Sequence, residues 1–115
     1  MPPKHNPLNL NPLQLKTLTL LQALAGIEGH VVRKDEDGSV LVAGIPAPHG
    51  DHFHLGDAVV VSRDATGLSN AAAWVALERK GLIQSFFPEG ALLKPAGLDY
   101  DTGLRDVILH RHHGH

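Results

Sequence analysis

The chain has 115 residues, of which 43% are hydrophobic and 19% are charged. It is too apolar for a disordered chain, and its length suffices for one core but not for two independent ones. Ten basic and twelve acidic residues leave a formal net charge of −2, which argues against a strongly electrostatic partner such as nucleic acid. There is no cysteine, so disulfides, thiolate catalysis and the common zinc-finger frameworks are excluded.

The chain carries no signal for a membrane. No apolar run approaches the roughly 20 residues that a membrane span needs, and the N-terminus lacks a secretory pattern. A cysteine-free chain also suits a reducing compartment. We therefore expect a cytoplasmic protein that does not contact membranes.

The first predicted helix covers residues 13–25. Asn11 is a typical N-cap acceptor, Pro12 suits the first helical position, and Gly26 is a typical C-terminal end. The preceding residues 1–11 contain three prolines and three asparagines, which disfavour regular structure. We expect them to form a flexible leader.

Residues 29–45 predict a β-hairpin, because two β-branched runs flank the turn-forming pair Asp37-Gly38. A proline-rich loop follows at residues 46–50. Residues 51–55 then alternate in polarity, which would place the two histidines of this run on one side of a strand and its apolar residues on the other.

Residues 58–66 allow two interpretations. Asp57 could cap a helix over this segment, whereas its three consecutive valines favour a strand. We favour the helix. Ser69 then caps a second helix over residues 70–80, which Gly81 ends.

The last part of the chain predicts a second hairpin, formed by residues 82–87 and 91–94, and a final helix that begins at Pro95. The histidine-rich tail, residues 110–115, lacks an apolar anchor, so we expect it to fray. The apolar side chains of the predicted elements indicate one shared core made of Leu20, Leu21, Leu24, Trp74, Leu77, Leu82, Ile83 and Leu104.

Two segments resemble winged helix-turn-helix regulators. The run WVALERKGLI at residues 74–83 is similar to the end of that family's recognition helix, where a leucine, charged residues, a glycine and two aliphatic residues lead into the wing. The run LKPAGL at residues 93–98 is similar to the exit from the wing. The resemblance covers about residues 57–104. It implies an α+β fold in which residues 12–109 form one winged-helix-like domain, with an extra β-hairpin inserted after the first helix.

The resemblance implies a small regulatory or adaptor module with DNA as one candidate partner, whereas the apolar residues Val75, Phe86 and Phe87 indicate a protein partner or a second copy of the chain. The residues that would form the partner or nucleic-acid surface are Asn70, Val75, Arg79, Lys80, Phe86 and Phe87. The predicted helix offers few side chains for reading base edges, and Glu89 stands at the wing tip instead of the lysines or arginines that hold phosphates. A protein partner is therefore favoured over DNA.

The nine histidines suggest a second class of function. On a strand, His52 and His54 would point the same way, and His49 could fold over from the preceding loop. Three imidazoles suit zinc, and nickel or copper would also accept them. A histidine-based metal-binding protein is the alternative hypothesis, set against a polar edge whose histidines face solvent.

Catalytic patterns are weak. None of the serines lies in a nucleophile elbow, and the pair Gly26 and Gly29 is too short to form a phosphate loop. Asp99 and Asp101 flank a tyrosine, but two acids there equally suit the first turn of a helix. We therefore expect a non-enzymatic protein.

Overall fold

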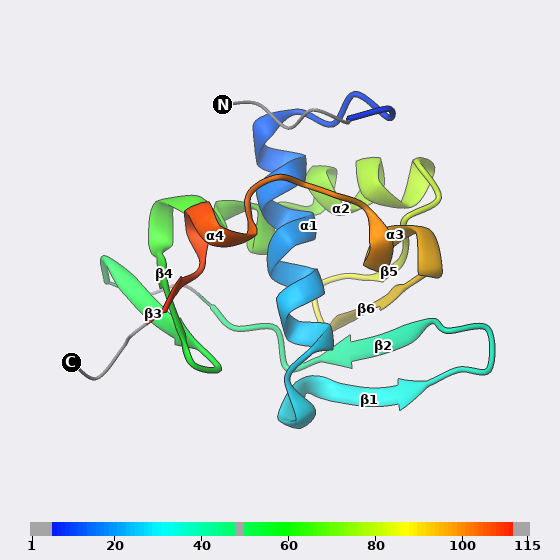
Figure 1. The fold of residues 1–115 in the computed structure, drawn as a ribbon, viewed down its shortest axis with the longest axis horizontal. Coiled ribbons are helices and arrows are strands. Elements are labelled where there is room, and N and C mark those ends of the chain that lie inside the picture. Colours follow the sequence, from blue (N-terminus) through cyan, green and yellow to red (C-terminus); the bar gives the residue numbers. More distant parts are fainter. Residues whose placement is uncertain (1–5, 48–49, 112–115) are drawn as a thin grey trace.

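The long helix α1 (Pro12–Ala25) runs through the middle of the protein, with sheets and shorter helices packed around it (Figure 1). The computed structural model describes residues 6–47 and 50–111. Helices and antiparallel sheets combine in one α+β arrangement, as expected. The predicted N-cap Asn11 forms a complete capping box with Gln14. The Asn11 side chain accepts the backbone N–H of Gln14 at 2.8 Å, and the Gln14 side chain accepts the backbone N–H of Asn11 at 3.0 Å.

Helix α1 is buried on most of its circumference. Its buried residues are Leu15, Thr17, Leu18, Thr19, Leu20, Leu21 and Leu24. The two threonine hydroxyls donate to backbone carbonyls one turn earlier, Thr17 to Leu13 and Thr19 to Leu15, each at 2.7 Å. Burial of these hydroxyls is therefore compensated within the helix itself.

Both predicted hairpins form, and they combine into one four-stranded sheet. The first contains β1 (Val31–Lys34) and β2 (Val40–Ala43), after the short helix η1 (Glu28–His30). The second contains β5 (Ile83–Phe86) and β6 (Gly90–Leu93). The strand order is β1-β2-β6-β5, so β2 and β6 pair in the middle. Helices α2 (Ala71–Arg79) and α3 (Pro95–Asp99) pack on this sheet together with α1.

The helix favoured over residues 58–66 is wrong, and the strand interpretation is right for its first half. β4 (Ala58–Val61) pairs with β3 (His52–Leu55) and with β7 (His110–Arg111) in a second, three-stranded sheet. The segment η2 (Ser62–Ser69) is a 3₁₀ helix. Strand pairing prevails over capping by Asp57, because β3 and β7 supply backbone partners on both sides of β4 and the strand buries its alternate residues against the core.

The predicted final helix is interrupted. It divides into α3 and α4 (Arg105–Ile108), with an irregular segment between them. Gly103 has a positive φ of 71°, and its N–H donates to the Asp101 carboxylate at 3.0 Å. The N–H of Leu104 donates to the Thr102 hydroxyl at 3.3 Å. These side-chain turns satisfy the backbone without a continuous helix.

The ends of the described chain are more ordered than the sequence indicates. Leu10 is buried, and Tyr100 donates its hydroxyl proton to the Asn6 side chain while accepting the N–H of Leu8 at 3.2 Å. The start of the tail forms strand β7. The expected flexible leader is therefore packed from residue 6 onward; residues 1–5 and 112–115 lie outside the described residues.

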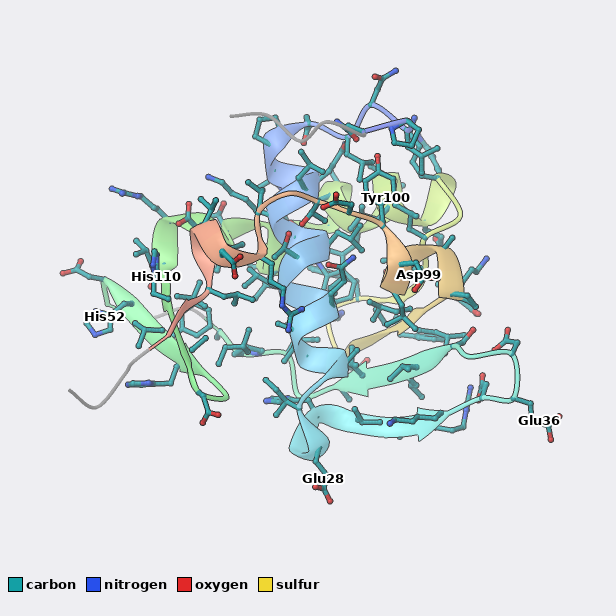
Figure 2. The ribbon with its side chains drawn as sticks, viewed as in Figure 1. Glu28, Glu36, His52, Asp99, Tyr100 and His110 are labelled. Carbon is teal, nitrogen blue, oxygen red and sulfur yellow. The ribbon has the colours of Figure 1, made fainter. Side chains whose placement is uncertain are left out.

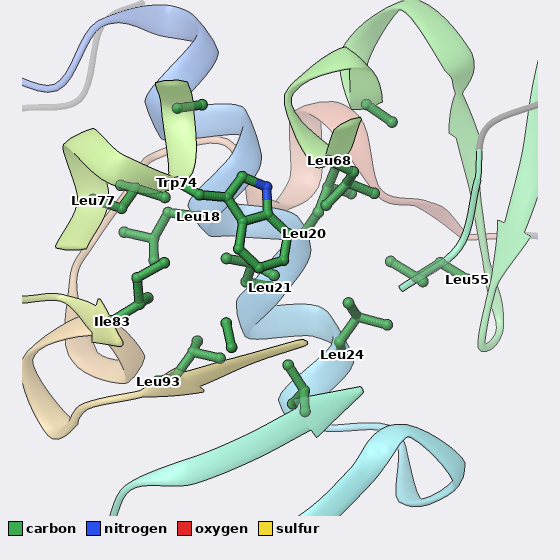
Figure 3. Close-up of a cluster of buried hydrophobic side chains, with 14 of the residues drawn as sticks. Leu18, Leu20, Leu21, Leu24, Leu55, Leu68, Trp74, Leu77, Ile83 and Leu93 are labelled. Carbon is green, nitrogen blue, oxygen red and sulfur yellow. The ribbon is translucent and has the colours of Figure 1, made fainter. Parts of the chain in front are cut away.

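The predicted core is confirmed (Figure 3). Seven of its eight residues are fully buried, and Leu104 is half-buried against the same cluster. Trp74 lies at its centre, and its indole N–H donates to the carbonyl of Gly67 at 3.0 Å. This bond satisfies the polar atom of the largest buried side chain and joins α2 to η2.

Candidate functional site

Four of the residues predicted for a binding surface lie in α2 or directly beside its ends. Val75 is 41% exposed, and Arg79 and Lys80 are exposed at the C-terminal end. Asn70 is exposed but serves as the N-cap, accepting the N–H of Ala72 at 3.0 Å. The side chain of Asn70 therefore caps α2, and this role accounts for an asparagine at this position without a binding partner.

The two phenylalanines of the second hairpin diverge. Phe86 is 48% exposed. Phe87 is half-buried, and its ring lies edge-on to Trp74 with the centroids 5.3 Å apart. Phe87 therefore belongs to the margin of the core, and Phe86 is the aromatic residue available to a partner.

Phe86 lies on the side of the four-stranded sheet that faces away from α1. The strand registers place Leu41 opposite Leu92, and Ala43 opposite Gly90, which in turn faces Phe86. We call Leu41, Ala43, Leu92 and Phe86 the outer sheet face. The first three side chains are half-buried, and alternate residues of the same strands are buried on the other side. The centre of this face is thus apolar.

Arg33 is the charged residue at the ladder positions of the outer sheet face, and it is paired; Glu89 is exposed at the tip of the β5–β6 hairpin. Arg33 pairs with Leu41 in the ladder, and its guanidinium lies 2.6 Å from the Asp35 carboxylate. That carboxylate raises the pKa of Arg33 by hydrogen bonding and by charge. At the opposite border stands Gln84, which is uncharged and exposed. Neither border residue presents an unpaired charge across the face.

The adjoining sheet edge is partly blocked. β5 is an edge strand, and the Glu78 carboxylate on α2 accepts the N–H of Ser85 at 3.0 Å. This side chain occupies a backbone donor that an added strand would need. A partner is therefore better accommodated on the sheet face than along this edge.

The histidine alternation is confirmed, since His52 and His54 are exposed on β3 while Phe53 and Leu55 are buried. His49, the third predicted metal ligand, lies outside the described residues. The register His54–Val59–His110 places His110 on the same face, two strand spacings or about 10 Å away. Figure 2 shows His52 and His110 on this small sheet. Within residues 6–47 and 50–111, no group of three metal-binding side chains is close enough to hold an ion.

The sequence did not indicate a cleft that lies where α1, the β3–β4 turn and α4 meet. It has a volume of about 340 Å³. Its lining residues are Ala23, Gly26, Ile27, Leu55, Gly56, Asp57, Ala58, Arg105, Asp106 and Leu109. A second hollow of about 280 Å³ shares the lining residues Arg105 and Asp106 with this cleft. No sequence motif marks the cleft, because its walls come from three separate parts of the chain.

No protein-family model matches this chain, and no curated protein or solved structure is significantly similar to it. In the part of the chain that the structure describes, no helix is long and apolar enough to cross a membrane.

Proposed function

We propose that this chain is a non-catalytic regulatory or adaptor module of winged-helix type that binds a second copy of itself through the outer sheet face. The observation that carries the proposal is the exposure of Phe86, at 48%, beside the apolar row formed by Leu41 and Leu92. Exposed apolar patches of this kind are commonly interaction sites.

A second copy suits this face because the ladder positions of the face present no unpaired charge. When two identical surfaces meet, each charge faces a like charge near the two-fold axis, which is unfavourable. Here Arg33 is already paired with Asp35, and Gln84 is neutral. Two such sheets can pack face to face about 10 Å apart, as in a β-sandwich.

The size of the face predicts weak association. Four strands spaced by about 4.8 Å, each with four residues rising about 3.3 Å, span roughly 19 by 13 Å. Stable interfaces bury about 800 Å² per partner, several times this area. We therefore expect dimers that form at high micromolar concentration and dissociate on dilution.

The winged-helix assignment is supported by the order of elements. η2 and α2 stand where the helix-turn-helix pair is expected, Gly81 ends α2, and the β5–β6 hairpin follows directly. The exposed side of α2 presents two alanines, Val75, Glu78 and Arg79, and the hairpin tip carries the exposed Glu89. This composition favours a protein partner over DNA, where several basic contacts to phosphate are needed.

The experiment is sedimentation velocity from 10 µM to about 1 mM, with Phe86→Ser as the test variant. Phe86 has about 100 Å² exposed, so its burial is worth about 2 kcal/mol per copy, and the variant should weaken dimerisation at least tenfold. Val107→Ser is the matched control, because Val107 is 59% exposed on α4, away from the face. It should leave the dimer unchanged.

Three outcomes would reject the proposal. The wild-type chain could stay monomeric at the highest concentration. Alternatively, Val75→Ser could abolish the dimer while Phe86→Ser does not, which would assign the interface to α2. Binding of duplex DNA at low salt, with loss of affinity in Arg79→Ala, would replace the protein partner by DNA.

A further inference from the structure

The cleft beside α4 combines an apolar floor with three charged groups. Its floor contains five aliphatic side chains: Ala23, Ile27, Leu55, Ala58 and Leu109. Its charged lining residues are Asp57 on the β3–β4 turn and Arg105 and Asp106 on α4. A volume of about 340 Å³ is at the lower end of the range for small-molecule sites, so only a small ligand would fit.

These charged groups are available to a ligand. Within residues 6–47 and 50–111, the side chains of Asp57, Arg105 and Asp106 form no ion pair and accept or donate no hydrogen bond. All three residues are exposed at the surface. Their charges are therefore not committed to holding the fold together.

The end of α1 adds a fourth electrostatic feature. Ala23 and Gly26 line the cleft, and they belong to the last turn and the C-cap of this 14-residue helix. A helix C-terminus carries partial negative charge that favours a cation, and α1 has no basic residue in its last turn. The same wall thus favours an ammonium group.

We propose that this cleft binds a free α-amino acid with an apolar side chain. The ammonium group would be held by Asp57 and Asp106 near the end of α1, and the carboxylate by Arg105, while the side chain covers the aliphatic floor. A simple amine would leave Arg105 unmatched. A simple carboxylate would meet two carboxylates of the same sign, so the zwitterion fits the charges best.

The turn at Gly56 shapes one wall of this cleft. Gly56 has a positive φ of 59° in a two-residue hairpin turn, and a Cβ there would lie 3.0 Å from Cδ1 of Ile27. A glycine therefore permits both the turn and the close contact with the floor residue Ile27. The backbone N–H groups of these residues are suitable reporters of binding.

The test uses the ¹⁵N-labelled full chain and three ligands that share one branched alkyl group. L-leucine carries both charges, 3-methylbutylamine lacks the carboxylate, and 4-methylpentanoate lacks the ammonium group. We expect leucine to shift the amide signals of Ile27, Gly56 and Leu109 in a saturable way. Each single-charge analogue should bind at least tenfold more weakly.

Variants separate the two charges. Arg105→Leu should weaken leucine binding at least tenfold and leave 3-methylbutylamine unchanged, whereas Asp57→Asn should weaken leucine and the amine together. Arg79→Leu and Asp99→Asn are the matched controls, because both residues are exposed and lie outside the cleft. The amide spectrum of each variant also reports whether the fold is retained.

The inference is overturned if none of the three ligands shifts the cleft signals at millimolar concentration. It is also overturned if the shifts spread over the whole surface, or if Arg105→Leu and Arg79→Leu change leucine binding equally. Preferential binding of the amine alone would replace the amino acid by a hydrophobic cation as the ligand.

Discussion

The contact between η2 and α1 depends on a glycine. At Gly67 the backbone approaches Thr17 so closely that a Cβ would lie 1.8 Å from the Thr17 hydroxyl oxygen and 3.3 Å from Cδ1 of Leu13. The φ of Gly67 is not positive, so alanine is allowed by the backbone and only the contact opposes it. Gly67→Ala therefore tests the packing of these two elements without a conformational complication.

The magnitude follows from the neighbouring atoms. The Cβ would be about 1.6 Å short of an ordinary contact, and overpacking of this kind costs about 1–3 kcal/mol. Moving the Thr17 hydroxyl also endangers its 2.7 Å bond to Leu13, worth about 0.5–1.5 kcal/mol. We expect Gly67→Ala to reduce the free energy of unfolding by about 2–4 kcal/mol.

A double mutant isolates the cause. Thr17→Ala removes the hydroxyl oxygen, after which the remaining contacts at 3.1 and 3.3 Å require only small adjustments. The double mutant Gly67→Ala, Thr17→Ala should therefore lose at least about 1 kcal/mol less unfolding free energy than the two single mutants lose in sum.

The assay is urea unfolding followed by the fluorescence of Trp74, the only tryptophan of the chain and a fully buried one. Gly29→Ala is the control, because a Cβ at Gly29 has no atom within 4 Å, and it should change the free energy by less than about 0.5 kcal/mol. Additive single effects, or a Gly67→Ala variant as stable as the wild type, would refute the close packing of η2 on α1.

Two further predictions concern the core and the first hairpin. Leu77 is fully buried, so Leu77→Ala should lower the free energy of unfolding in urea by about 2–5 kcal/mol. Val75→Ala is the control and should cost little, because Val75 is exposed. A loss below about 1 kcal/mol in Leu77→Ala would contradict the place of Leu77 in the core. The N–H of Ser39 donates to the Asp37 carboxylate at 2.8 Å and lowers the pKa of that carboxyl below its ordinary value of 3.8. Because the folded-state pKa is the lower one, this stabilisation is present above pH 3.8 and is lost as the pH falls through the folded-state pKa. Asp37→Asn should flatten the dependence of the unfolding free energy on pH below 3.8, and an unchanged slope would show that the turn hydrogen bond is absent.

Local signals in the sequence determined several elements. The N-cap Asn11 and the proline after it determine where α1 begins, because they act within one turn of the backbone. The pair Asp37-Gly38 and the β-branched runs beside it likewise determine the first hairpin. The leucines and Trp74 indicated the core, since large apolar side chains of a small domain have only one interior in which to lie.

The tertiary structure decided what depends on partners distant in the sequence. The local sequence of residues 58–61 allows a helix or a strand. The distant strand β7 pairs with β4, and the core buries Ala58 and Val60, so the tertiary structure selects the strand. Of the adjacent residues Phe86 and Phe87, the first faces outward because of the register of β5, and the second packs against Trp74. The cleft is assembled by α1, the β3–β4 turn and α4. Such a hollow has no sequence signature, because its shape and charge depend on how separate segments pack together.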